Sequence, residues 1–329
     1  MIEVDTKKQI QAMIAYDSLS HMRVMPDCRV GHGCCVGFTS VVACDKVVPS
    51  FVGGDIGCGI LTYPLNKTKM NLERLDRRIR ALIPMGVGRE HIYNSSPMEQ
   101  SFIERYLDRA QESARQFAAG RGVSAPTLDY NYFTTLCGTI GIDVDLCIRS
   151  FGTLGGGDHF IEVNQDPAEQ LYITVHSGSR SFGMKLFEYH NSKVSTTARC
   201  LNEQDSLAYC FDMILAQHLA VLNRHIMLQL ILRECGFDFD PAKLIESTHN
   251  YIDFSTRVLR KGAISAQDGE LCIAQRRITL KDVVSSSVCR ETLDEAPQAY
   301  KDMDMIVEAL EPTMHIVARL VSVMNLKGH

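Results

Sequence analysis

The sequence lacks several features that would place it in a specialised class of protein. It has no tryptophan, no internal repeat, no low-complexity segment and no CxxC pair among its 12 cysteines. No apolar run is long enough to cross a bilayer, and residues 1–5 do not resemble a signal peptide. The net charge of −5 excludes an overall basic field that would drive non-specific nucleic-acid binding. We therefore predict free thiols in a reducing compartment, the cytoplasm or alternatively the nucleus, and no membrane association.

The 329 residues are 45% hydrophobic, which is enough to bury a substantial core. No linker is evident, so we predict a single domain over residues 1–329 with a mixed α and β, or α+β, fold. Helices are expected at 7–20, 71–82, 96–119, 203–235 and 296–310, and strands at 47–52, 245–252 and 316–324, with a loop-rich connection at 120–150.

A glycine-rich loop at residues 53–59 is the first candidate for chemistry. It follows the expected strand at 47–52 and contains four glycines, which permit a tight turn. The turn would present Asp55 and Cys58 toward one point, where an oxygen and a thiolate can bind one metal centre. The alternative is a simple glycine turn beside a buried free cysteine.

Three histidines stand at expected strand ends, bordered by small or polar residues. They are His159, His176 and His249. Together with Asp55 and Cys58 they form a set that suits one metal ion with an open position, or two ions sharing the thiolate. Taken singly, each histidine is as readily explained as a hydrogen-bonded core residue.

Two glycine-rich turns favour phosphate binding beside this metal set. Residues 152–157 offer consecutive backbone N–H groups, and the turn at 177–180 adds Arg180. Both kinds of group bind phosphate oxygens. The combination indicates phosphate chemistry, in which divalent ions neutralise charge.

The sequence resembles a known family, the RtcB tRNA-splicing RNA ligases. The matching motifs appear in the family's order along nearly the whole chain. They are Met25-Pro26-Asp27, Asp55–Gly59, Gly152–Gly155, His159–Glu162, His176–Arg180, Asn223-Arg224, His249–Tyr251, Arg260–Ala263, Asp294–Pro297, Ala299–Asp302 and Lys327-Gly328.

The resemblance implies an RtcB-like domain with central β-sheets around a metal site and flanking helices. It implies an enzyme that joins a 3′-phosphate or 2′,3′-cyclic phosphate RNA end to a 5′-hydroxyl end in tRNA splicing or RNA repair. The implied cofactors are GTP and two Mn²⁺ ions, with Zn²⁺ as the alternative metal. The implied partners are cleaved RNA, such as tRNA halves, and an archease-like activator.

The resemblance also assigns roles to individual residues. Cys58 would bridge the two ions, and Arg29, Arg180 and Lys261 are candidates for binding phosphate or RNA. The implied metal ligands are Asp55, Cys58, His159, His176 and His249, and the implied nucleotide-binding residues are Asp158, His159, Phe160, Ile161, Glu162, His249, Asn250 and Lys327.

The sequence departs from the family pattern at three places. Arg29 replaces a histidine, and Asp158 replaces an asparagine beside the metal histidine. Beyond Ala263, the family's Pro-Gly-Ser-Met-Gly loop and His-Gly-Ala-Gly-Arg motif are both absent. The histidine of that motif carries the guanylate, and none of the 11 histidines here lies in a His-Gly-x-Gly context.

These departures leave several functions open. Three interpretations fit the departures. The chain could be a ligase whose guanylate-accepting segment has been omitted, or a ligase that uses another nucleophile. It could also be a non-ligating paralogue that binds metal and RNA ends. A metal-dependent phosphoesterase acting on cyclic phosphate ends is a further alternative, because a metal pair can activate water without a guanylyl step.

Overall fold

The computed structural model describes residues 2–67, 69–90, 100–166, 168–265 and 321–327. Its helices are α1 (Val4–Ile14), α2 (Leu72–Leu82), α3 (Gln100–Ala119), α4 (Tyr130–Thr139), α5 (Val144–Ser150), α6 (Arg180–Asn191) and α7 (Glu203–Cys235), with short 3₁₀ turns η1 (Pro49–Phe51) and η3 (Pro241–Lys243). Its strands are β1 (Leu19–Arg29), β2 (Val36–Val42), β3 (Gly59–Pro64), β4 (Phe160–Gln165), β5 (Leu171–Ser177), β6 (Ile245–Thr248), β7 (Asn250–Asp253), β8 (Val258–Lys261) and β9 (Val321–Lys327). The predicted mixed α+β class is confirmed.

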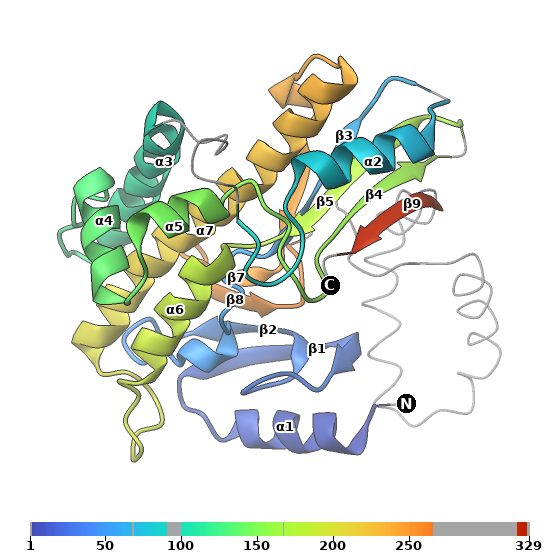
Figure 1. Ribbon diagram of the computed structural model, residues 1–329. Coiled ribbons are helices and arrows are strands. Elements are labelled where there is room, and N and C mark those ends of the chain that lie inside the picture. The colour runs from blue at the N-terminus through green and yellow to red at the C-terminus, as the bar shows by residue number, and fades with distance from the viewer. Residues whose placement is uncertain (1, 68, 91–99, 167, 266–320, 328–329) are drawn as a thin grey trace, which may run out of the picture.

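The strands form two antiparallel sheets. The first has the order β1-β2-β8-β7, and the second has the order β6-β3-β5-β4-β9. Helix α1 contacts β1, while α7 contacts β3 and β5 of the second sheet and also packs against α2, α3 and α6 (Figure 1). The chain passes from the second sheet to the first at His249, which lies between β6 and β7.

Helix α7 is the predicted helix at residues 203–235, with the same bounds. Asn202 caps its start by accepting a hydrogen bond from the Asp205 backbone N–H. Gly236 ends it in the left-handed conformation, with φ of 70°, as expected for a glycine after a helix. Buried residues lie on every side of its middle turns, so the helix packs against the rest of the protein on more than one face.

Helix α2 also matches its prediction. The Asn71 side chain accepts a hydrogen bond from the Arg74 backbone N–H, and Leu75 and Ile79 face the core. The segment at 100–119 is helical as expected, and the proposed start of that helix at 96–99 lies outside the described residues. The expected helix at 296–310 also lies outside them.

Four expectations need correction. The helix expected at 7–20 is shorter, because α1 ends at Ile14 and Leu19 already begins β1. The strand expected at 245–252 is divided at His249 into β6 and β7, which belong to different sheets. Residues 47–52 are buried apart from Ser50 but do not form a strand, because Pro49 cannot donate to a ladder and instead starts the turn η1. The connection at 120–150 holds two short helices, α4 and α5, whose N-termini are capped by Asp129 and Asp143. The last strand, expected at 316–324, is described from Val321 to Lys327, and residues 316–320 lie outside the described part of the chain.

Candidate metal centre

The loop between η1 and β3 positions the first two candidate ligands. Gly57 has φ of 72°, and a Cβ atom there would lie 3.0 Å from the Gln217 Cα of α7, so glycine is needed for both torsion and space. The Gly57 N–H donates to the Asn250 carbonyl at 2.8 Å, and the Cys58 N–H donates to the Asp55 carbonyl at 3.2 Å. These bonds fold the loop so that Asp55 and Cys58 face the ends of the neighbouring strands.

The second sheet brings the three histidines to the same place. Gly59 pairs with Ser177 of β5 on one side and with Thr248 of β6 on the other. His176 pairs with Phe160, the residue after His159. Because these ladders are antiparallel and in register, residues far apart in the sequence end up beside the start of β3.

The five predicted ligands converge, and their donor atoms lie within contact of one another. The Cys58 Sγ is 3.4 Å from the His159 Nε2 and 3.3 Å from the His176 Nε2. The His176 Nε2 is 3.2 Å from the His249 Nε2, and the His159 Nε2 is 3.1 Å from the Asp55 Oδ2. Cys58 and the three histidines are buried, whereas the Asp55 side chain is 36% exposed.

The donor atoms divide into two groups that share one sulfur. Cys58, His176 and His249 form one group, and Asp55, Cys58 and His159 form the other. Separations slightly above 3 Å suit donors that surround an ion at bond lengths of roughly 2.0–2.3 Å. The set of one carboxylate, one thiol and three imidazoles therefore fits divalent metal binding, with Cys58 as the residue that the two donor groups share.

Backbone carbonyls orient two of the imidazole rings. The Leu154 carbonyl lies 2.9 Å from the His159 Nδ1, and the Asp158 carbonyl lies 3.2 Å from the His176 Nδ1. In the tautomer in which Nδ1 donates, each ring leaves its Nε2 lone pair free to face the cluster, as in many metal sites. The His249 Nδ1 is buried without a hydrogen-bond partner among the described residues.

The surroundings set the protonation states of the ligands. Burial raises the pKa of the Cys58 thiol well above its usual range, and the Asp55 carboxylate raises it further. Burial, and then His159, lowers the pKa of His176 to about 4, and burial and His176 lower the pKa of His249 well below its usual value. Burial opposes ionisation of Asp55, but the hydrogen bond and charge of His159 hold its pKa low. The neutral imidazoles of His176 and His249 and the Asp55 carboxylate are ready to bind a cation, which would displace the Cys58 thiol proton.

The predicted nucleotide-binding residues differ in how close they lie to this cluster. The Phe160 ring packs against His176, whereas Ile161 is completely buried in the core. Asp158 is exposed on the turn before β4. The Glu162 carboxylate accepts a hydrogen bond from Asn164 at 3.0 Å. The Asn250 amide donates to the Asp55 carbonyl at 3.3 Å and accepts from the Gly262 N–H at 3.0 Å, so this side chain supports the metal loop. Lys327 pairs through its backbone with Phe160, one residue from His159.

The three phosphate candidates differ in position. The Arg180 Nη1 is 3.5 Å from the His159 Nδ1, and its Nε donates to the Thr153 hydroxyl, so it borders the cluster. Lys261 is buried, and its ammonium donates to the carbonyls of His32 and Ser50. Arg29 is exposed at the end of β1. Only Arg180 contacts a predicted metal ligand in the described part of the chain.

In the sequence, Asn223 and Arg224 stood out only as one of the motifs, and no function was predicted for them. In the structure both are completely buried in α7, and both bind backbone groups of the loops that carry the ligands. The signal in the sequence was a polar residue and a cation side by side within an otherwise apolar helical segment.

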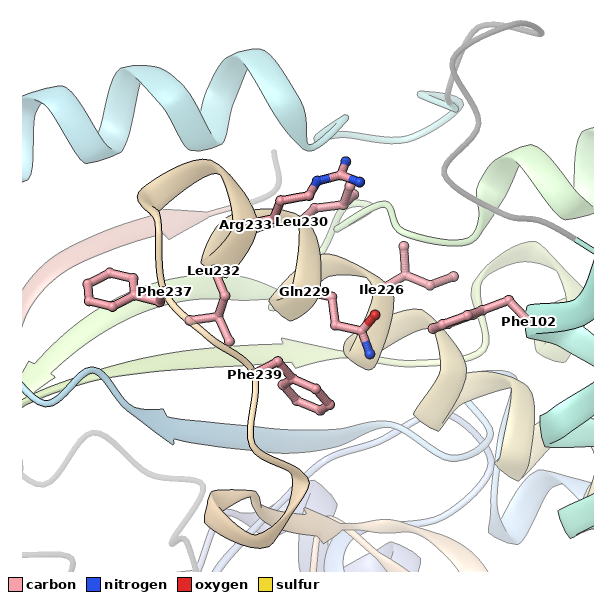
Figure 2. A pocket seen from close by; sticks show the side chains of 8 residues that line it. All are labelled: Phe102, Ile226, Gln229, Leu230, Leu232, Arg233, Phe237 and Phe239. Carbon is pink, nitrogen blue, oxygen red and sulfur yellow. The ribbon is translucent and has the colours of Figure 1, made fainter.

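A separate hollow lies farther along α7. It encloses about 290 Å³ between Ile226 and Leu230 of α7, Phe102 of α3, and Phe237 and Phe239 in the segment that follows (Figure 2). Gln229 and Arg233 supply the polar groups of its lining. None of the predicted metal ligands lines this hollow, so it is not part of the cluster.

In the part of the chain that the structure describes, none of the helices combines the length and the apolar character that a membrane span requires.

Comparison with known proteins agrees with the resemblance. The family described as "tRNA-splicing ligase RtcB" matches residues 9–287, which is most of the chain. The "RNA-splicing ligase RtcB" of Escherichia coli K12 is 24% identical over 400 aligned positions, covering 99% of this chain and 95% of the relative. The "tRNA-splicing ligase RtcB" of Pyrobaculum aerophilum is 25% identical over 246 residues, covering 63% of this chain and 50% of that relative.

The longer alignment also supports the shortening noted in the sequence. Because 99% of 329 residues is about 326, roughly 74 of the 400 aligned positions have no residue in this chain. The chain therefore aligns over nearly its whole length while lacking many positions that its bacterial relative has.

Proposed function

Because the chain belongs to the RtcB family of tRNA-splicing ligases, we propose that it is an RNA ligase that joins a 3′-phosphate or 2′,3′-cyclic phosphate end to a 5′-hydroxyl end. The observation that carries the proposal is the pair of donor groups that share Cys58. A mononuclear or purely structural site would not need two groups meeting at one sulfur. RNA with such ends, including tRNA halves, is the proposed substrate, in tRNA splicing or RNA repair.

The five clustered side chains would hold two divalent ions, which we propose to be Mn²⁺, with Zn²⁺ as the alternative. When bound, the ions would neutralise negative charge on the reacting phosphates. Asp55 and His159 would hold one ion, His176 and His249 the other, and the Cys58 thiolate would contact both. Because burial lowers the pKa values of His176 and His249, these two residues keep neutral donor nitrogens available at neutral pH.

Arg180 is proposed to bind the RNA phosphate beside these ligands. Its guanidinium lies against Gly155, where a Cβ atom would occupy the same space, so the side chain has a defined path toward His159. Arginine recognises phosphate through two parallel N–H donors. The positive charge would draw the phosphate end of the RNA to the half of the cluster that contains His159.

GTP is the proposed source of energy for ligation. Its guanylyl group would pass to the RNA 3′-phosphate with release of pyrophosphate. The 5′-hydroxyl would then attack the RNA phosphorus, forming the phosphodiester bond and expelling GMP. Asp158, Phe160, Ile161, Glu162, Asn250 and Lys327, together with His159 and His249, are the proposed contacts of the nucleotide. An archease-like protein is the proposed activator, and Arg29 and Lys261 are further candidates for contacts with RNA.

The guanylylation step can be tested directly. The full chain is incubated with GTP labelled in its α-phosphate, Mn²⁺ and an archease-like activator, then run on a denaturing gel. A labelled protein band whose label maps to a histidine is expected if the chain ligates by the family route. An unlabelled band, with the bacterial relative labelled in parallel, would refute that route for this chain.

A second candidate function is favoured by one observation, the absence of any His-Gly-x-Gly sequence. We propose as the alternative a non-ligating paralogue that binds metal and recognises RNA ends. It predicts tighter binding of RNA ending in a 3′-phosphate than of the same RNA ending in a 3′-hydroxyl, and loss of bound metal in Cys58→Ala. The matched control is Cys235→Ala, because Cys235 lies at the far end of α7.

The two candidates and the phosphoesterase alternative give different products. Joined RNA that requires GTP identifies a ligase, and binding without any reaction identifies the paralogue. Conversion of a 2′,3′-cyclic phosphate to a 3′-phosphate without GTP would instead identify a phosphoesterase. Unchanged metal content in Cys58→Ala would contradict all three, since each depends on the shared sulfur.

A further inference from the structure

We propose that Asn223 and Arg224, consecutive residues in the middle of α7, are positioning residues that set the distance between the two halves of the metal centre. The inference rests on the proposed metal centre and adds the part of the protein that holds it in shape. Neither side chain is among the clustered donor atoms. Each acts through the backbone of the segments that carry those donors.

Arg224 joins the loops of Cys58 and His176. Its side chain is completely buried, and its Nη1 donates to the Gly57 carbonyl at 2.7 Å and to the Ser177 carbonyl at 2.8 Å. Gly57 precedes Cys58 in the chain, and Ser177 follows His176. One nitrogen atom therefore fixes the two backbones whose side chains approach within 3.3 Å at the shared sulfur.

Arg224 is also connected to the strand that leads to His249. Its Nε donates to the Glu246 Oε1 at 2.8 Å, and Glu246 lies on β6 three residues before His249. The other oxygen of Glu246 is 3.2 Å from the His225 Nε2, and the Tyr106 hydroxyl is 2.6 Å from the His225 Nδ1. These contacts hold the Glu246 carboxylate between α7 and α3.

Asn223 holds the remaining segment, the loop before His159. Its Oδ1 accepts hydrogen bonds from the backbone N–H groups of Gly152 and Thr153, at 2.8 and 3.2 Å. Its Nδ2 donates to the Ser177 hydroxyl and to the Gly178 carbonyl, both at 3.0 Å. The Ser177 hydroxyl in turn donates to the Leu154 carbonyl, which orients His159.

The two residues thus reach all four segments that supply metal ligands. An arginine without exposure in a helix is costly to desolvate, and an apolar side chain of similar size would avoid that cost. The Arg224 Nη2 has no hydrogen-bond partner among the described residues, which adds to the cost. The donors that are satisfied point at ligand-bearing loops, so positioning explains the pair better than helix stability does.

The test compares Arg224→Lys with Arg233→Lys, a change at an exposed position nine residues later in the same helix. Lysine keeps the charge but lacks the rigid fork that reaches Gly57, Ser177 and Glu246 together. We expect Arg224→Lys to bind Mn²⁺ or Co²⁺ about 10- to 100-fold more weakly, as is typical when a supporting contact of a metal ligand is lost. Arg233→Lys should bind as the wild type does.

Spectroscopy separates positioning from a general loss of stability. Two Mn²⁺ ions that share a sulfur give a spin-coupled signal in electron paramagnetic resonance, and Co²⁺ bound to a thiolate gives a charge-transfer absorption band. If circular dichroism shows that Arg224→Lys is folded, we expect its coupled signal to weaken and its Co²⁺ band to shift. Folded Arg224→Lys with wild-type affinity and spectra would overturn the proposal.

A second variant keeps the proposal testable if Arg224→Lys does not fold. Glu246→Gln keeps Arg224 and an acceptor oxygen but removes the charge that holds the guanidinium in place. It should lower Mn²⁺ affinity and weaken the coupled signal in the same direction, and wild-type behaviour of this variant would refute the inference. Wild-type protein that binds fewer than two ions would refute the proposed metal centre itself, together with this inference.

Discussion

The charge of Glu246 should contribute measurably to the stability of the protein, and its contribution should depend on pH. The carboxylate accepts hydrogen bonds from the completely buried Arg224 and from His225, and its own side chain is only 22% exposed. Burial opposes its ionisation, but the Arg224 charge and the His225 hydrogen bond outweigh burial and lower its pKa from 4.5 to about 2.

This pKa gives the size of the effect. The native carboxyl holds its pKa about 2.5 below the ordinary value, and each pKa unit corresponds to about 1.4 kcal/mol, so the charged form contributes roughly 3 kcal/mol. Removing one partner of a buried ion pair typically costs about 3–5 kcal/mol, which is in the same range. Glu246→Gln should therefore lower the free energy of unfolding by about 3 kcal/mol at pH 7.

The sign of the pH dependence follows from the direction of this shift. Because the folded-state pKa lies below the unfolded-state value, the contribution is fully present above about pH 4.5 and disappears as the pH falls through about 2. The difference between wild type and Glu246→Gln should therefore be constant from pH 7 to pH 5 and shrink steadily between pH 4.5 and pH 2.

Urea unfolding of the metal-free protein is the suitable measurement. Urea is uncharged and does not screen the ion pair, and a chelator removes any stability that comes from bound metal. The matched control is Glu188→Gln, because Glu188 pairs with Lys185 on the exposed face of α6 and is 52% exposed. Such a pair contributes about 0–1 kcal/mol. A Glu246→Gln effect that is as small as this, or that does not change with pH, would refute the reasoning.

Two further predictions concern single contacts. Gly178 lies against Asp55, and a Cβ atom there would overlap the Asp55 Oδ1. Gly178→Ala should therefore displace this carboxylate and reduce the proposed two bound ions to one, as measured by elemental analysis. Retention of two ions would contradict the geometry. Asn71→Ala should remove the cap of α2 and lower the free energy of unfolding by about 1 kcal/mol, measured in urea, because the Arg74 N–H loses its acceptor. Asn71→Asp keeps an acceptor and should retain most of that stability, whereas equal losses in the two variants would contradict a capping effect.

The sequence by itself determined the local elements that have strong end signals. The bounds of α7 follow from a capping asparagine and a terminal glycine, and the start of α2 follows from Asn71, because these signals act within a few residues. The order of the motifs also determined the family and the five candidate ligands. The short helices α4 and α5 were missed because seven to ten residues show too few turns of a helical pattern.

The tertiary structure alone decided how those ligands are arranged. The sequence left open whether the ligands form one donor group or two groups that share Cys58, because this depends on the register of β3 with β5 and β6. The same holds for Arg224, whose bonds to Gly57 and Ser177 join residues more than 40 positions away from it. Antiparallel pairing and the packing of α7 are long-range interactions, so they place the residues that local sequence patterns could only name.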